Sequence, residues 1–233
     1  MDGRTPPPKG YVTARNVQFP WRGAIVGPHI RNKLQTDTYE AKEADAALRM
    51  VRPGDVVMEL GGGIGFMSAI LARNRDLSHV HVFEANAALV DYMHETHEVN
   101  GLDNITVHHA VLGKRKGTAN FYVRQQFMAS SLDKKDGADV IDTQQVEVRN
   151  AKSAIKAIKP TFLICDIEGA EAEVIPLMDL STVRTAVVEL HPQWIGPEGV
   201  NAVFRAFMDA GLAYAPRQSM RKVVTFRRAW PIK

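Results

Sequence analysis

Cysteine, long hydrophobic runs and an excess of charge of one sign are all scarce in this chain, and each shortage excludes a class of protein. The 233 residues include a single cysteine, Cys165, so no internal disulfide can form. No apolar run approaches the roughly 20 residues of a membrane-spanning helix, and residues 1–10 contain no hydrophobic segment typical of a signal peptide. We therefore expect a cytoplasmic protein with no membrane partner.

The charge balance does not indicate a nucleic-acid partner. The chain carries 29 lysines and arginines against 26 aspartates and glutamates, a formal net charge of +3. Most basic residues are scattered, and only the pairs Arg221-Lys222 and Arg227-Arg228 form clusters. This distribution allows contact with nucleic acid without arguing for it, so we do not expect such a partner.

The order of hydrophobic segments is typical of a single α/β domain. Because 45% of the residues are hydrophobic, a chain of this length can bury one sizeable core without a second domain. Segments rich in β-branched residues predict strands over 56–60, 80–85, 105–110, 161–167 and 185–190. Segments with helical periodicity predict helices over 37–50, 66–75, 87–100, 170–178 and 199–210. This alternation predicts a mostly parallel sheet with helices on both faces.

Two regions depart from the alternation. Residues 118–123 and 144–150 have the pattern of two extra strands, and the intervening region, 124–145, has few core-forming residues, so we interpret it as a lid loop. Near the C-terminus, residues 212–219 and 222–228 predict an antiparallel hairpin.

The beginning of the chain differs in composition from the rest. Residues 1–36 include a stretch rich in proline, glycine and arginine with little periodicity, which predicts an irregular N-terminal arm or cover. Phe19 and Trp21 are the side chains expected to anchor it. Residues 37–233 are then the main domain.

The densest motif is the string E-L-G-G-G-I-G, in which Glu59 ends the first strand and Gly61, Gly63 and Gly65 alternate through a turn into a helix. Glycine permits the backbone angles of a tight turn and lets a ligand approach the main chain closely. A dinucleotide site would direct the free N–H groups of the helix start at a pyrophosphate. A site for S-adenosylmethionine (SAM) would use them, with Glu59, to hold the amino acid part and the ribose. The carboxylate of Glu59 disfavours a phosphate.

An acidic residue at the end of the second strand strengthens this interpretation. Glu84 follows the glycine turn at a distance typical of a carboxylate that binds both hydroxyls of a ribose. The turn alone would be weak evidence, since it could simply join a strand to a helix.

From Tyr39 to Pro192, the motifs resemble the FkbM-type family of SAM-dependent methyltransferases, which methylate hydroxyls of sugars, antibiotics and other natural products. The resemblance rests on VVMELGGGIGFMSAILAR (56–73), VHVFEANAALVDYMHETHEVNGL (80–102), NITVHHAVLG (104–113), LICDIEGAEAEVI (163–175) and VVELHP (187–192). It implies a Rossmann-like class I methyltransferase fold, with a mostly parallel seven-stranded sheet whose last strand inserts antiparallel. It also implies SAM as the cofactor, S-adenosylhomocysteine as its product and a small-molecule acceptor as the partner.

The resemblance also implies the residues of the cofactor site, with Ala110 and Val111 near the adenine. The implied set is Tyr39, Glu40, Glu59, Gly61, Gly63, Gly65, Glu84, Asn86, Ala110, Val111 and Asp166. One position departs from the family pattern: Ile164 stands where the family usually has a lysine, two residues before Asp166. On a strand, both side chains point the same way, so the cation expected beside the carboxylate is missing.

Candidate catalytic groups lie where the parallel strands end, which is the usual position of ligands in such sheets. A hydroxyl acceptor must lose its proton, and we expect Asp166 or His191 to be the base. For Glu168 and Glu171, the more ordinary interpretation is stabilisation of a helix start by its dipole. Asp166, Glu168 and His191 could also hold Mg²⁺ or Mn²⁺, but no spacing demands a metal and we predict none.

Three other functions compete with this one. A nicotinamide-dependent oxidoreductase shares the glycine turn and the acidic partner, although Glu59 argues against it. A nucleic-acid methyltransferase would use the basic clusters, but the sequence shows no separate RNA-binding module. A non-catalytic nucleotide-binding protein could keep the fold and lose the chemistry.

Overall fold

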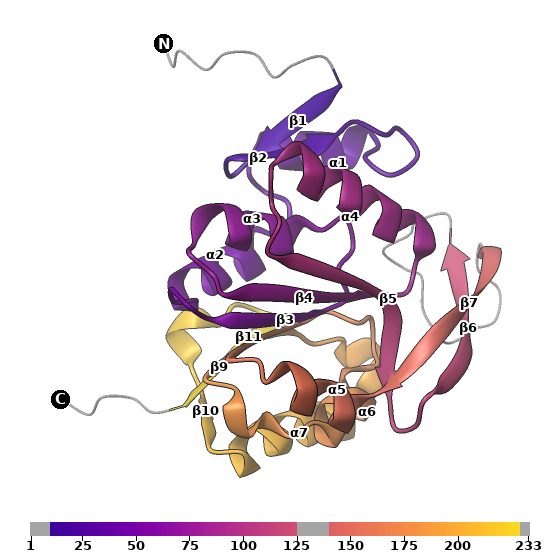
Figure 1. Ribbon diagram of the computed structural model, residues 1–233. Coiled ribbons are helices and arrows are strands. Elements are labelled where there is room, and N and C mark those ends of the chain that lie inside the picture. Colours follow the sequence, from indigo (N-terminus) through magenta and orange to yellow (C-terminus); the bar gives the residue numbers. More distant parts are fainter. Residues whose placement is uncertain (1–9, 125–139, 229–233) are drawn as a thin grey trace.

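The computed structural model describes residues 10–124 and 140–228, and the fold is a central sheet between two layers of helices (Figure 1). Most of the predicted lid loop, 124–145, therefore lies outside the described residues. No helix within the described ranges is both long and apolar enough to cross a membrane.

The main sheet has nine strands in the order β10-β11-β9-β8-β3-β4-β5-β7-β6. Strands β3, β4, β5, β8 and β9 run parallel, and β11 inserts antiparallel between β9 and β10. The strands are β3 (Val56–Leu60), β4 (His79–Glu84), β5 (Ile105–Gly113), β6 (Gly117–Arg124), β7 (Val140–Asn150), β8 (Phe162–Cys165), β9 (Thr185–Glu189), β10 (Leu212–Tyr214) and β11 (Val223–Arg228).

This arrangement confirms the predicted fold class and the terminal hairpin. Seven of the strands form the expected sheet with its antiparallel inserted strand, while β6 and β7 extend it beyond β5. These two are the extra strands that the sequence predicts at 118–123 and 144–150. The full sheet therefore has two strands more than the seven of the family pattern.

Alternating side chains of β3 and β8 contribute to two different cores, one on each face of the sheet. Val57 and Ile164 belong to the core beneath the upper helices, whereas Met58, Leu163 and Cys165 belong to the opposite core. The upper helices are α1 (Pro28–Gln35), α2 (Ala41–Met50), α3 (Phe66–Asn74) and α4 (Ala87–Val99). The lower helices are α5 (Ala151–Ile158), α6 (Glu171–Val174) and α7 (Pro192–Asp209). Cys165 is fully buried.

Some helices differ from the prediction. The segment predicted as one helix over 170–178 is the short helix α6 followed by a 3₁₀ turn, Ile175–Leu177. Helix α7 begins at Pro192, seven residues before the predicted start. Its backbone is non-helical at Gly196 (φ 63°), where the helix is kinked. Helix α5 follows β7 and precedes β8 along the chain, and it is not among the helices predicted from the sequence.

The arm is more regular than its composition predicts. Within it, β1 (Tyr11–Ala14) and β2 (Val17–Pro20) form an antiparallel hairpin ahead of α1. Phe19 is fully buried, as expected of an anchor, but Trp21 is 50% exposed, with the guanidinium of Arg31 over its ring. Because the hairpin buries apolar side chains in the core shared with α3 and α4, it is part of the packed structure. The boundary at residue 36 stays a prediction.

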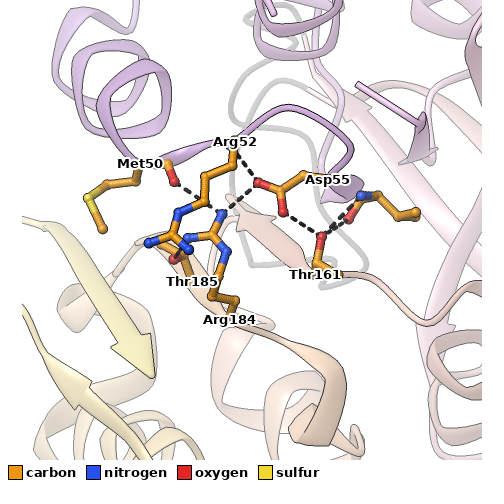
Figure 2. Close-up of polar contacts among 7 residues, drawn as sticks. Met50, Arg52, Asp55, Thr161, Arg184 and Thr185 are labelled. Atoms are coloured by element: carbon orange, nitrogen blue, oxygen red, sulfur yellow. Dashed lines mark hydrogen bonds and ion pairs between the residues drawn. The ribbon is translucent and has the colours of Figure 1, made fainter. Parts of the chain in front are cut away.

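A network centred on Asp55 joins elements at the amino ends of the central strands, at the opposite end of these strands from the predicted site (Figure 2). Asp55 is 6% exposed, and its Oδ2 accepts hydrogen bonds from the backbone N–H of Arg52 and from Nη2 of Arg184, both at 2.6 Å. Its Oδ1 accepts a hydrogen bond from the hydroxyl of Thr161 at 2.7 Å. Arg184 also donates to the carbonyl of Met50 at 3.2 Å. The end of α2 is thereby tied to the starts of β3, β8 and β9.

We expect Asp55→Ala to lower the free energy of unfolding by about 3 kcal/mol, because it leaves the Arg184 guanidinium without its buried partner. The control is Glu147→Ala, which removes an exposed ion pair with Arg149 and should cost less than about 1 kcal/mol. Urea unfolding of both variants measures the difference. Equal losses would show that the Asp55 network does not hold these elements together.

Candidate active site

A cavity of about 560 Å³ opens at the carboxyl ends of β3, β4, β8 and β9. The position agrees with the general rule that ligands of parallel α/β sheets bind beyond the ends of the strands. Most of the residues predicted for the site line it. These are Tyr39, Glu40, Glu59, Gly61, Gly63, Glu84, Ala110, Val111 and Asp166.

The space available for a side chain differs among the three alternating glycines of the turn, Gly61, Gly63 and Gly65. Gly61 has φ 83°, and a Cβ there would overlap the carbonyl oxygen of Asp166, so no other residue fits. Gly65 has φ 71° and caps α3, where a Cβ would press on the side chain of Met93. Gly63 has φ 53° and open space where a Cβ would stand. Gly61 and Gly65 thus serve the packing of the turn, and Gly63 is the glycine with room for a ligand.

Glu84 shapes the turn as well as lining the cavity. It is 7% exposed, and its Oε2 accepts a hydrogen bond from the Gly63 N–H at 2.9 Å. Its Oε1 accepts one from the Asn86 N–H at 2.7 Å. Burial raises the pKa of Glu84, and these backbone hydrogen bonds oppose the shift. Glu84 therefore holds the turn through backbone N–H groups and also presents its carboxylate in the lining of the cavity.

Glu59 offers a buried oxygen that no described residue satisfies. The side chain is 1% exposed, and its Oε2 has no hydrogen-bond partner within the described part of the chain. Burial and the nearby charge of Glu40 raise its pKa well above the ordinary value. An acceptor in this state is costly unless a donor meets it, so this position suits a ligand that brings a hydroxyl or ammonium group.

Tyr39 and Glu40 stand at the junction before α2. Tyr39 is buried and packs edge-on against Phe66, with ring centroids 5.1 Å apart. Glu40 adopts the left-handed conformation, with φ 42°, at the start of α2. Burial and the charge of Glu43 raise the pKa of Glu40 to about 8, although its hydrogen bond with Tyr39 opposes the shift.

The wall formed by β4, β5 and β6 is apolar. Ala110 is fully buried, and Val111 lies beside it on β5. Phe83 and Phe121 line the same cavity from β4 and β6. Flat apolar walls of this kind suit an aromatic heterocycle, which agrees with the predicted adenine position. Phe121 was not among the predicted site residues because its strand belongs to the extension of the sheet.

A cluster of acidic groups surrounds His191 where β8 and β9 end. Nδ1 of His191 lies 2.7 Å from Oε1 of Glu171, which is completely buried. Nε2 lies 3.4 Å from Oε2 of Glu168 and 3.8 Å from Oδ1 of Asp166. One ligand atom each from Asp166, Glu189 and His191 lie within 4.8 Å of one another.

The charges in this cluster shift its proton affinities upward. Burial raises the pKa of Asp166 well above 3.8, and the carboxylates of Glu189 and Glu40 raise it further. Burial alone would lower the pKa of His191, but its hydrogen bond with Glu171 and the charge of Glu168 raise the pKa overall. Groups with such shifts in a cavity are typical of sites that transfer protons.

Three predicted residues do not line the cavity. Gly65 and Asn86 cap the starts of α3 and α4, and the side chain of Asn86 accepts a hydrogen bond from the Ala88 N–H. His191 is 3% exposed and stands behind the carboxylates. Ile164, at the position of the family lysine, is buried at the cavity wall. A cation still reaches the cluster, because Nζ of Lys222 lies 2.9 Å from Oε1 of Glu189.

Comparison with known proteins adds a family match. The family model described as the methyltransferase FkbM domain matches residues 57–214, which run from the second residue of β3 to the end of β10. A search of curated proteins finds no match.

Several solved structures are similar. Methyltransferase FkbM from Methylobacillus flagellatus KT is 15% identical with a TM-score of 0.50, and the match covers 84% of this chain and 52% of that one. Trm5b from Pyrococcus abyssi is 10% identical with a TM-score of 0.51, covering 97% and 58%. Magnesium protoporphyrin IX methyltransferase from Synechocystis PCC 6803, solved with bound SAM, is 16% identical with a TM-score of 0.48, covering 89% of both. The first two likenesses show a shared fold, and this chain spans little more than half of either protein.

The two glycines with different surroundings give a direct test of the turn. We expect Gly61→Ala to lower the free energy of unfolding by more than about 3 kcal/mol, because the added Cβ meets backbone that cannot move away. Gly63→Ala meets open space and should cost about 1 kcal/mol from its positive φ alone. Urea unfolding of both variants provides the measurement, and equal effects would contradict the close approach of Gly61 to Asp166.

Proposed function

The chain belongs to the FkbM family of methyltransferases, and from this we propose that it transfers a methyl group from SAM to a hydroxyl of a small molecule, such as a sugar or a natural product. One observation carries the proposal. The glycine turn and the unpaired Glu59 oxygen lie in the same cavity as the strand-end carboxylate Asp166. The cavity thus combines a place for a nucleoside with a group that can take a proton.

The residues present fit SAM as the cofactor. The unpaired oxygen of Glu59 suits the ammonium or a hydroxyl of the ligand, and the carboxylate of Glu84 in the cavity lining suits ribose hydroxyls. Ala110 and Phe121 supply apolar walls for the adenine. When bound, SAM supplies a methyl group on a positively charged sulfur, and this charge suits a cavity lined by acidic side chains.

The acceptor is proposed to lie beside Asp166. With SAM held by the glycine turn, Glu59 and Glu84, its methyl group would be supplied to an acceptor hydroxyl held beside Asp166. Holding the two groups in line supplies much of the rate. Asp166 takes the hydroxyl proton, since its raised pKa makes it a stronger base than an ordinary aspartate. His191 is the second group that could accept the proton, through its Nε2, which faces Asp166 and Glu168.

The rival functions receive less support from the cavity. Eight carboxylates line it, and none of its described lining residues is a lysine or arginine, which disfavours the pyrophosphate of a nicotinamide cofactor or the phosphates of a nucleic acid. The eight are Glu40, Glu43, Glu59, Glu84, Asp166, Glu168, Glu173 and Glu189.

The cofactor assignment is tested by calorimetric titration with S-adenosylhomocysteine. We expect the native protein to bind it, and Glu84→Gln and Gly63→Val each to weaken binding at least about tenfold without unfolding the protein. NADH titrated in parallel should show no binding. Undiminished affinity in both variants would refute the assignment, and binding of NADH alone would favour the oxidoreductase.

The proton-transfer role is tested by the pH dependence of turnover. A base must be deprotonated to act, so the rate should rise with pH through the raised pKa of Asp166. Asp166→Asn should lower turnover by about 100-fold or more and abolish that rise. S-adenosylhomocysteine release, measured with a panel of sugars and other hydroxylated compounds, provides the assay. A variant with native turnover would exclude Asp166 as the base.

A further inference from the structure

We propose that Asp166, Glu189 and His191 form a binding site for a divalent cation such as Mg²⁺ or Mn²⁺ at the acceptor end of the cavity. The binding itself needs only the geometry of these residues, whereas the role we give the cation rests on the proposed function.

The three side chains come from the ends of two adjacent parallel strands. Asp166 follows β8, and Glu189 and His191 stand at and just after the end of β9. One ligand atom from each lies within 4.8 Å of the others. Ligands about 2.1 Å from a cation are separated by roughly 3 Å when adjacent and roughly 4.2 Å when opposite. Small side-chain adjustments therefore suffice to close this set around an ion.

A buried carboxylate fixes the orientation of His191. Glu171 is completely buried, and its Oε1 accepts hydrogen bonds from Nδ1 of His191 at 2.7 Å and from the Gly169 N–H at 3.0 Å. This leaves Nε2 as the nitrogen that faces the other carboxylates. A carboxylate behind the far nitrogen of an imidazole is the usual support of a histidine that ligates a metal. A histidine that served packing alone would not need its open nitrogen directed at Asp166 and Glu168.

The oxygen of Asp166 that faces this nitrogen lacks a close donor. Oδ1 is buried and has no hydrogen-bond partner among the described residues, and Nε2 of His191, at 3.8 Å, is beyond hydrogen-bonding distance. A buried carboxylate oxygen is costly without a donor or a cation. Lys222 does not fill this place, because its Nζ pairs with Oε1 of Glu189 at 2.9 Å.

The donor set also selects the kind of ion. Two carboxylates and one imidazole are mostly hard oxygen ligands, which favour Mg²⁺ or Mn²⁺ over ions that prefer thiolates. Glu168, whose Oε2 lies 3.4 Å from Nε2 of His191, can supply a further oxygen. The remaining positions would be open to the acceptor.

Such a cation would answer a chemical need of the proposed reaction. A hydroxyl bound to a divalent ion ionises more easily, so with the ion bound Asp166 and His191 would hold the ion instead of taking the proton, and the proton would leave to water. The positive charge would also add to that of Lys222, which pairs with Glu189, in balancing the carboxylates of the cluster.

The test is Mn²⁺ binding to the whole 233-residue chain, measured as the loss of the free-ion signal in electron paramagnetic resonance. We expect saturable binding of one ion, weakened about tenfold or more in Glu189→Gln and in Asp166→Asn. The matched control is Glu173→Gln, which removes another cavity carboxylate outside the trio and should bind Mn²⁺ as the native protein does.

Each outcome has a distinct meaning. Absence of saturable binding, or native affinity in Glu189→Gln, overturns the cation site, and an equal loss in Glu173→Gln reduces it to general attraction by negative charge. Circular dichroism of the variants confirms that they fold. A titration with S-adenosylhomocysteine separates the two proposals: if it binds but Mn²⁺ does not, only the cation site fails. If Mn²⁺ binds but S-adenosylhomocysteine does not, the site stands and the proposed function fails.

Discussion

The close approach of the Gly61 backbone to the carbonyl of Asp166 is the contact on which the site depends. Two neighbouring parallel strands, β3 and β8, run together until the Asp166 N–H donates to the carbonyl of Leu60 at 2.9 Å. Immediately beyond, the chain of each strand turns away, and only a residue without a Cβ lets the two turns pass. The cavity opens at this divergence, with the glycine turn on one side and the carboxylate cluster on the other.

The same divergence sets the electrostatics. Side chains at the ends of β8 and β9 enter a space walled by packed strands, so their charges are poorly solvated and raise one another's proton affinities. Glu171 shows how this is managed locally. It is buried without exposure to solvent, and His191 and the Gly169 N–H both donate to its Oε1, whereas its Oε2 has no hydrogen-bond partner among the described residues. Function and stability are therefore coupled in this cluster.

Local patterns in the sequence were sufficient to predict the sheet, the glycine turn and the family. Each depends on residues close together in the chain, such as Glu59 and the glycines that follow it. The N-terminal hairpin was missed because its turn, Arg15-Asn16, lacks the glycine typical of such turns, yet both residues adopt positive φ. Contacts from distant residues stabilise it, since Asp37 accepts the Arg15 N–H and Asp45 pairs with its guanidinium. The pairing of Glu171 with His191 is likewise non-local, as the two are 20 residues apart.

The position of Cys165 gives the molecule a built-in reporter. It is the only thiol in the sequence, it is fully buried on β8, and burial raises its pKa well above the ordinary value. A thiol that is both protonated and inaccessible does not react with disulfide reagents. Its labelling in a native sample therefore requires the structure around β8 and the cavity to open. The rate of thiol labelling then follows the opening of the region that carries the site, without any engineered probe.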